Sequence, residues 1–175
     1  LTNQNYIKNG TVIDKLLQSL IVDMTKVEDL LIGDKNAVLV AARILGYGQD
    51  YTFKYPHPDT GVEEELTIDL TEAEDKLIDE SKMVNGQNEF EFELPTSKMF
   101  ITFKLLTQAD EKLIEQELKG LKKINKNASP ELTTRLKHVI QSINGDRTQK
   151  TIREFIDNSF LARDSRAFRA HLDNI

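Results

Sequence analysis

The side chains that could do chemistry are few and widely separated in this sequence. The three histidines, His57, His138 and His171, have no second histidine four residues away and no carboxylate at metal-ligand spacing. The chain has no cysteine, which excludes thiol catalysis, disulfide bonds and Cys-ligated metal sites. Because catalytic and metal centres need several such groups together, the sequence predicts no catalytic residue, no metal site and no bound cofactor.

Carboxylates are abundant, but they occur in runs, at residues 63–65, 72–75 and 89–93. Glycosidase-type catalysis needs two carboxylates in unlike environments, whereas alternation along a strand places acids together on one exposed face. The glycines of residues 46–48 follow a predicted helix, and phosphate-binding loops precede one. We therefore expect the protein not to be an enzyme.

Composition indicates a folded globular protein. Of 175 residues, 39% are hydrophobic and 30% are charged, so the chain is unlike a disordered one. Its longest apolar run, residues 37–42, is far shorter than the roughly 18 residues that cross a bilayer. Residues 1–10 are polar and unlike a secretory signal peptide. We expect no membrane-spanning segment, and the absence of cysteine fits a reducing compartment.

Charge is divided unevenly along the chain. Residues 1–95 carry 8 basic and 19 acidic side chains, and residues 96–175 carry 15 and 10, which together give the net charge of −6. The acidic part would repel nucleic acid, whose binding depends on neutralising phosphates. The charges could be solvated faces or could match head to tail between neighbouring molecules. A nucleic-acid-binding regulator that uses the basic helices of residues 107–172 remains the alternative function.

The first part of the chain predicts helices. Apolar residues at helical spacing indicate a helix over residues 11–22, and residues 26–32 form a short helix or turn that ends at Gly33. Residues 34–45 have almost no polar face, with Asp34 suited to the N-cap and Gly46 to the end of the helix. Such a helix is expected to be buried on most sides.

Apolar residues then alternate with polar ones, which is typical of strands. The period of two predicts a β-hairpin over residues 51–70, with its turn at residues 56–61. A second hairpin is predicted over residues 90–105, with its turn at residues 95–98. Each hairpin would have one apolar face.

The remainder predicts helices. Thr107 and Asp110 have the spacing of a capping box before a helix that reaches Ile124. A second helix begins at Pro130 and runs through Ile143, and two more follow, the last from near Asp164.

These elements define an α+β fold. It has N-terminal helices, two antiparallel β-hairpins in a small sheet and a C-terminal helical bundle. Residues 1–106 form a helix and hairpin region and residues 107–175 a helical region. We expect the two regions to make one compact domain.

The last helix combines arginines with aromatic and aliphatic side chains, a composition favoured at protein interfaces. Its arginines are three residues apart, and therefore lie along one side of the helix. We expect removal of residues 164–175 to leave folding intact and to abolish binding to a partner. The predicted partner-binding residues are Phe160, Arg163, Arg166, Phe168, Arg169 and Leu172.

Three stretches, residues 30–51, 51–70 and 160–172, resemble those of a known family. Their order and motifs, GDKNAVLVAARILGYG in the first and ARDSRAFRAHL in the last, are similar to the T4-type bacteriophage baseplate hub proteins of contractile tails. The resemblance implies a structural or chaperone role in forming the central hub, through contacts with other hub proteins, with self-association as a further option. It also implies the host cytoplasm during assembly and the virion tail baseplate as locations.

Some members of that family carry a Cys-Pro-x-Cys-Gly knuckle at the tip of the first hairpin. The equivalent residues 55–61 of this chain contain one histidine and one aspartate and no cysteine. Because a structural zinc site needs four ligands, this hairpin must depend on strand pairing and packing.

Overall fold

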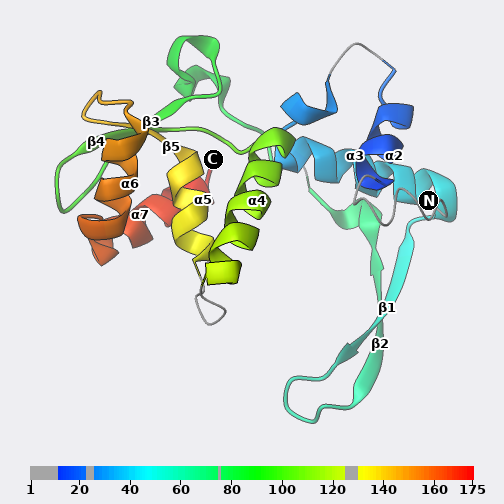
Figure 1. The fold of residues 1–175 in the computed structure, drawn as a ribbon. Coiled ribbons are helices and arrows are strands. Elements are labelled where there is room, and N and C mark those ends of the chain that lie inside the picture. Colours follow the sequence, from blue (N-terminus) through cyan, green and yellow to red (C-terminus); the bar gives the residue numbers. More distant parts are fainter. Residues whose placement is uncertain (1–11, 23–25, 75, 125–129) are drawn as a thin grey trace. The chain divides into compact units, whose positions relative to one another are not determined.

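The computed structural model describes residues 12–22, 26–74, 76–124 and 130–175. Helices lie towards both ends of the chain and the strands form two small antiparallel sheets, which confirms the predicted α+β class (Figure 1). Thr11 and Ser129, at the starts of two predicted helices, lie outside the described residues.

The chain divides into two compact units, residues 1–75 and residues 76–175. This division falls at residue 75 and not at the predicted residue 106. The physical reason is that the second hairpin shares its hydrophobic core with the helices that follow it.

The first unit is built from short helices and one hairpin. In this unit α2 packs on α3. Among the described residues of the unit, only Leu17 and Val27 are buried apolar residues. The strands β1 and β2 pair antiparallel with Phe53 opposite Leu66, which confirms the first predicted hairpin. The elements in order are α2 (Val12–Leu20), the 3-10 helix η1 (Val27–Asp29), α3 (Ile32–Tyr47), β1 (Asp50–Pro56), β2 (Glu63–Asp69) and the 3-10 helix η2 (Leu70–Glu72).

The apolar helix α3 differs from its prediction in burial and in bounds. None of its residues is buried, and Leu45 is 89% exposed. The helix begins at Ile32, so Gly33 lies inside it and is not a stop before it. The helix ends at Tyr47, and Gly48, with a φ of +87°, follows as the C-cap. A helix that is apolar on nearly all sides needs several neighbours to bury it, and within this unit the described elements cover only part of its surface.

In its described residues, the second unit combines a three-stranded sheet with four α-helices. The sheet has the order β3-β4-β5 and is antiparallel throughout. The hairpin of β3 and β4 confirms the second predicted hairpin. The elements are the 3-10 helices η3 (Glu80–Lys82) and η4 (Val84–Gly86), then β3 (Phe90–Glu93), β4 (Phe100–Phe103), α4 (Gln108–Ile124), α5 (Glu131–Val139), β5 (Ile140–Ile143), α6 (Gln149–Asn158) and α7 (Ala162–Leu172).

The prediction that one helix continues to Ile143 was wrong. The helix α5 ends at Val139, and the next four residues form β5 along the edge of β4. There Thr102 and Ser142 share a hydrogen bond of 2.8 Å between their hydroxyl groups. The apolar spacing of Ile140 and Ile143 fits a helix as well as a buried strand, and pairing with β4 decided between them.

The hydrophobic core of the second unit is centred on aromatic rings. Phe103 stacks on Phe90 at 5.6 Å between ring centroids and meets the edge of Phe168 at 5.1 Å. All three rings are buried, together with Ile101 and Ile152. The sheet, α6 and α7 therefore form one continuous core.

The start of α4 has the predicted capping box. The backbone N–H of Asp110 donates to the hydroxyl of Thr107 at 3.3 Å, and the backbone N–H of Thr107 donates to the carboxylate of Asp110 at 3.0 Å. Lys104 adds an ion pair to the same carboxylate at 2.7 Å. The reciprocal bonds satisfy N–H groups that the first turn of a helix leaves free.

Loss of this cap should measurably weaken the fold. We expect Thr107→Ala to lower the free energy of unfolding by about 1 kcal/mol, because it removes the oxygen that accepts the Asp110 N–H. The matched control is Thr148→Ala at the N-cap of α6, where the side chain makes no capping hydrogen bond. Urea denaturation of both variants measures the difference, and equal losses would contradict the capping role of Thr107.

Candidate functional site

The predicted partner-binding residues fall into two groups in the structure. Arg163, Arg166 and Arg169 are exposed on α7. Phe160 and Leu172 are half-buried and pack against the hydrophobic core. The three arginines are therefore accessible, whereas the two apolar side chains contribute mainly to the core.

Phe168 corrects the prediction most clearly. Its side chain is fully buried and contacts the rings of Phe92, Phe103 and Phe160. A residue in this position cannot bind a partner while the unit is folded. The sequence could not distinguish this ring from an exposed one, because an apolar residue on a short terminal helix suits either a core or an interface.

Asp164 is a structural residue that sequence reasoning did not single out. Its carboxylate is fully buried and accepts the backbone N–H groups of Thr96 at 2.7 Å and Ser97 at 3.0 Å, in the turn between β3 and β4. Burial acts to raise the pKa of Asp164, but the hydrogen bonds from Thr96 and Ser97 outweigh it and hold the pKa below its usual value.

These contacts overturn the expectation that residues 164–175 can be removed without harm to folding. Removal would delete Phe168 from the core and would leave two N–H groups of the β3–β4 turn without their acceptor. The helix α7 is therefore part of the fold of the second unit.

His171 lies against aromatic rings. Its ring stacks on Phe92 at 4.5 Å and meets the edge of Phe103 at 5.8 Å. Desolvation, with a smaller contribution from the charge of Lys82, lowers the pKa of His171. Beside it lies a cavity of about 470 Å³ that is lined by Lys82, Met83, Val84, Phe90, Glu91, His171 and Ile175.

His138 has a carboxylate partner that its own neighbourhood in the sequence does not reveal. Its Nε2 atom lies 3.0 Å from Glu117 of α4, and Arg153 of α6 donates to both oxygens of the same carboxylate at 2.7 and 3.0 Å. Hydrogen bonding from Arg153 is the main cause that lowers the pKa of Glu117 to about 2; burial opposes it, and His138 adds to the lowering. This cluster joins three helices and is structural.

Ion pairs also occupy much of the basic charge after residue 107. At least seven lysines and arginines among the described residues of this region contact carboxylates, which reduces the charge left to neutralise phosphates. The arrangement therefore does not favour the nucleic-acid alternative. The seven residues are Lys119, Lys122, Arg135, Lys137, Arg147, Lys150 and Arg153.

The hairpin of β1 and β2 presents an apolar face that the described elements of its own unit leave largely exposed. Figure 1 shows it as a two-stranded ribbon that extends away from α2 and α3 of its own unit. Tyr51, Leu66 and Ile68 are 41–42% exposed, and Phe53 lies between the rings of Tyr51 and Tyr55. Strand pairing places these side chains on one face, because Tyr51 lies opposite Ile68 and Phe53 opposite Leu66.

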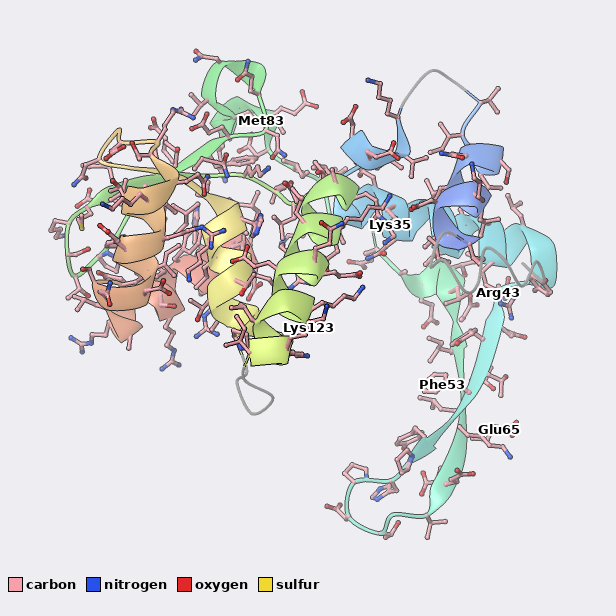
Figure 2. All side chains as sticks on the ribbon, in the orientation of Figure 1. Lys35, Arg43, Phe53, Glu65, Met83 and Lys123 are labelled. Atoms are coloured by element: carbon pink, nitrogen blue, oxygen red, sulfur yellow. The ribbon has the colours of Figure 1, made fainter. Side chains whose placement is uncertain are left out.

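The opposite face of the hairpin is polar. Thr52 and Thr67 share a hydrogen bond of 2.7 Å between their hydroxyl groups, and Glu65 lies opposite Lys54. Figure 2 marks Phe53 of the apolar face and Glu65 of the polar face. The unit to which the hairpin belongs is acidic, since residues 1–75 carry 6 basic and 14 acidic side chains. The hairpin therefore has an apolar face and belongs to a unit with a net negative charge.

Arg43 fixes the base of the hairpin. Its guanidinium, marked in Figure 2, donates to the carbonyl oxygens of Gly48 at 3.0 Å and Asp50 at 3.2 Å. It also lies over the rings of Tyr47 and Tyr51, at 5.0 and 5.7 Å from their centroids. These contacts tie the end of α3 to the start of β1, so the hairpin leaves the helix in a defined direction.

Neither a metal centre nor a membrane span appears in the part of the chain that the structure describes. No group of three or more histidine, aspartate or glutamate side chains there is arranged to hold a metal ion. None of the described helices combines the length and the apolarity that crossing a bilayer requires.

Comparison with known proteins identifies a family. The family model described as T4 bacteriophage base plate protein matches residues 2–162. The matched range includes the whole β1–β2 hairpin and ends at the first residue of α7. No curated protein and no solved structure matches the chain significantly.

Proposed function

The chain belongs to the T4 bacteriophage base plate protein family, and from this membership we propose that it helps to build the central hub of the tail baseplate through protein–protein contacts. The family makes it a structural protein of a T4-type phage baseplate, with other baseplate proteins as partners and the virion tail as its location. The hub, and a chaperone role there during assembly in the host cytoplasm, are the finer parts of the proposal. The proposed role requires no catalytic step by this protein.

The single observation that carries the contact role is the uncovered apolar face of the β1–β2 hairpin. An isolated two-stranded sheet is marginally stable in water, and contiguous exposed apolar surface marks sites of protein contact. Tyr51, Phe53, Leu66 and Ile68 would be buried when a hub protein covers this face. The family match includes the whole hairpin, which supports a role that members share.

The exposed arginines of α7 are a second predicted contact. Arg163, Arg166 and Arg169 lie on the surface of a helix that the core holds in place through Phe168. Arginine is enriched at interfaces because its planar group makes several directed hydrogen bonds. We propose that these side chains bind acidic groups of a partner.

A paired substitution tests the contact role of the hairpin. We expect Phe53→Ser with Leu66→Ser to abolish incorporation into hub complexes, because it removes the centre of the apolar face. The matched control is Glu65→Ser with Thr67→Ser, which alters neighbouring positions on the opposite face. Purified tails and infected-cell lysate are compared for each variant by quantitative mass spectrometry, after circular dichroism has shown equal helix content.

The same measurement tests the hub assignment. Cross-linking within tails or lysate should join this chain to hub proteins, and recovery from both tails and lysate indicates a permanent component. Recovery with hub proteins from lysate alone indicates an assembly chaperone. Cross-links confined to baseplate proteins outside the hub, or unchanged incorporation of the Phe53→Ser, Leu66→Ser variant, would overturn the proposal.

A further inference from the structure

The outer edge of β1 offers a second binding surface on the hairpin. The sheet of β1 and β2 has two strands, so each has one edge without a strand partner in the described part of the chain. The N–H of His57 donates to Val62 and the N–H of Leu70 donates to Gln49. Since ladder bonds alternate along a strand, the odd-numbered residues of β1 bond to β2, and Thr52 and Lys54 direct their backbone groups outwards.

The two free edges of the hairpin differ in charge. By the same alternation, the outward-facing positions of β2 include Glu63, Glu65 and Asp69. A row of acids discourages pairing with a second copy of the same edge, because like charges would lie opposite each other. The edge of β1 carries one acid, Asp50, and one base, Lys54. Lys54 lies opposite Glu65 in its own hairpin, but neither it nor Asp50 is among the ion pairs of the described residues.

We propose that β1 pairs antiparallel with β1 of a second copy of this chain, about a two-fold axis at Thr52. In this register Asp50 lies opposite Lys54 of the second copy, and Lys54 lies opposite Asp50 of the second copy. Each charge therefore faces an opposite charge across the new strand pairing. Tyr51 lies opposite the second Phe53, an aromatic pair of the kind that stabilises antiparallel strands. Registers centred on Asp50 or on Lys54 would instead place like charges together.

Backbone hydrogen bonding is compatible with this register. Residues 50, 52 and 54 all direct their backbone groups outwards, and the register pairs even-numbered residues with even-numbered ones. Arg43 already donates to the carbonyl of Asp50, so the central bonds are those between the two Thr52 residues. Pairing creates a four-stranded sheet whose apolar face is twice as wide. The inference stands on the strand geometry and does not depend on the hub assignment.

A single cysteine tests the register in the purified 175-residue chain, which has no cysteine of its own. Residues in a hydrogen-bonded antiparallel pair lie about 5.5 Å apart between Cα atoms, within the range that a disulfide spans. Oxidation with diamide, which accepts the two hydrogens, should link Thr52→Cys into dimers at least tenfold faster than Thr67→Cys. Both variants break the same Thr52–Thr67 hydrogen bond, so they differ only in the edge that they probe. Equal rates would overturn the proposal.

A charge exchange tests the ion pairs independently. Lys54→Asp places acids opposite each other and should raise the dimer dissociation constant about tenfold, because two exposed pairs are lost. The double variant Asp50→Lys, Lys54→Asp restores opposite charges and should recover most of the association. Sedimentation equilibrium measures the dimer dissociation constants of the parent, the single variant and the double variant. Equal dissociation constants for all three proteins would contradict the proposed register. Failure here, with normal incorporation into tails, would leave the hub proposal standing.

Discussion

Replacement of Phe168 by alanine should lower the free energy of unfolding by about 3–5 kcal/mol, the usual cost of removing a large buried ring. Phe168 is fully buried and contacts the rings of Phe92 in β3, Phe103 in β4 and Phe160, so the cavity would open at the centre of the core. Urea denaturation followed by far-ultraviolet circular dichroism measures the change.

The control for this prediction lies on the same helix. Arg166→Ala alters an exposed side chain of α7 and should change the free energy of unfolding by less than about 0.5 kcal/mol. A loss for Phe168→Ala as small as that of the control would show that α7 is a detachable segment. Such a result would support the expectation from the sequence that residues 164–175 can be removed without loss of folding.

Acid should weaken the protein through Glu117. The pKa of this carboxyl is lowered from 4.5 to about 2, chiefly by hydrogen bonding from Arg153. A group whose pKa is lower in the folded state stabilises that state above the unfolded pKa, and this stability is lost as pH falls through the folded pKa. A shift of this size corresponds to about 3 kcal/mol, which should disappear between about pH 5 and pH 2.

A neutral substitution isolates this contribution. Glu117→Gln cannot be protonated, so its loss of stability between pH 5 and pH 2 should be smaller than that of the parent by about 3 kcal/mol. The control is Glu115→Gln on the same helix, whose carboxylate is 59% exposed and pairs with Lys119 at 3.6 Å. Urea denaturation at a series of pH values measures how the free energy of unfolding of each variant changes with pH. Parallel curves for the parent and Glu117→Gln would show that the Glu117–Arg153 contact carries no such linkage.

The features predicted correctly are those that neighbouring residues determine. The period of two across residues 51–70 and 90–105 predicts two hairpins, and strand pairing confirms them with Phe53 opposite Leu66 and Phe90 opposite Phe103. The Thr107 and Asp110 spacing predicts the capping box at α4. In each case the hydrogen-bond partners lie within a few residues or across one turn, so local chemistry is sufficient.

The errors arose where distant residues decide. Ile140 and Ile143 became part of a strand because the edge of β4 was available to pair with them. The helix α3 stayed partly exposed because its unit supplies few elements to cover it. Glu117 and His138 are 21 residues apart, and only the packing of α4 against α5 brings them together.

The candidate site shows the same division. The alternation of Tyr51, Phe53 and Tyr55 is enough to predict an apolar hairpin face, but not that the face would stay uncovered. Likewise, the composition of α7 predicts arginines beside apolar residues, but cannot say which of them are buried. The sequence by itself determined the class of fold, the two hairpins and the alternation of their faces, because these depend on local hydrogen bonding and periodicity. Only the tertiary structure decided that Phe168 and Asp164 belong to the interior and that the apolar face of the β1–β2 hairpin stays exposed within its own unit, because burial depends on which distant segments pack together.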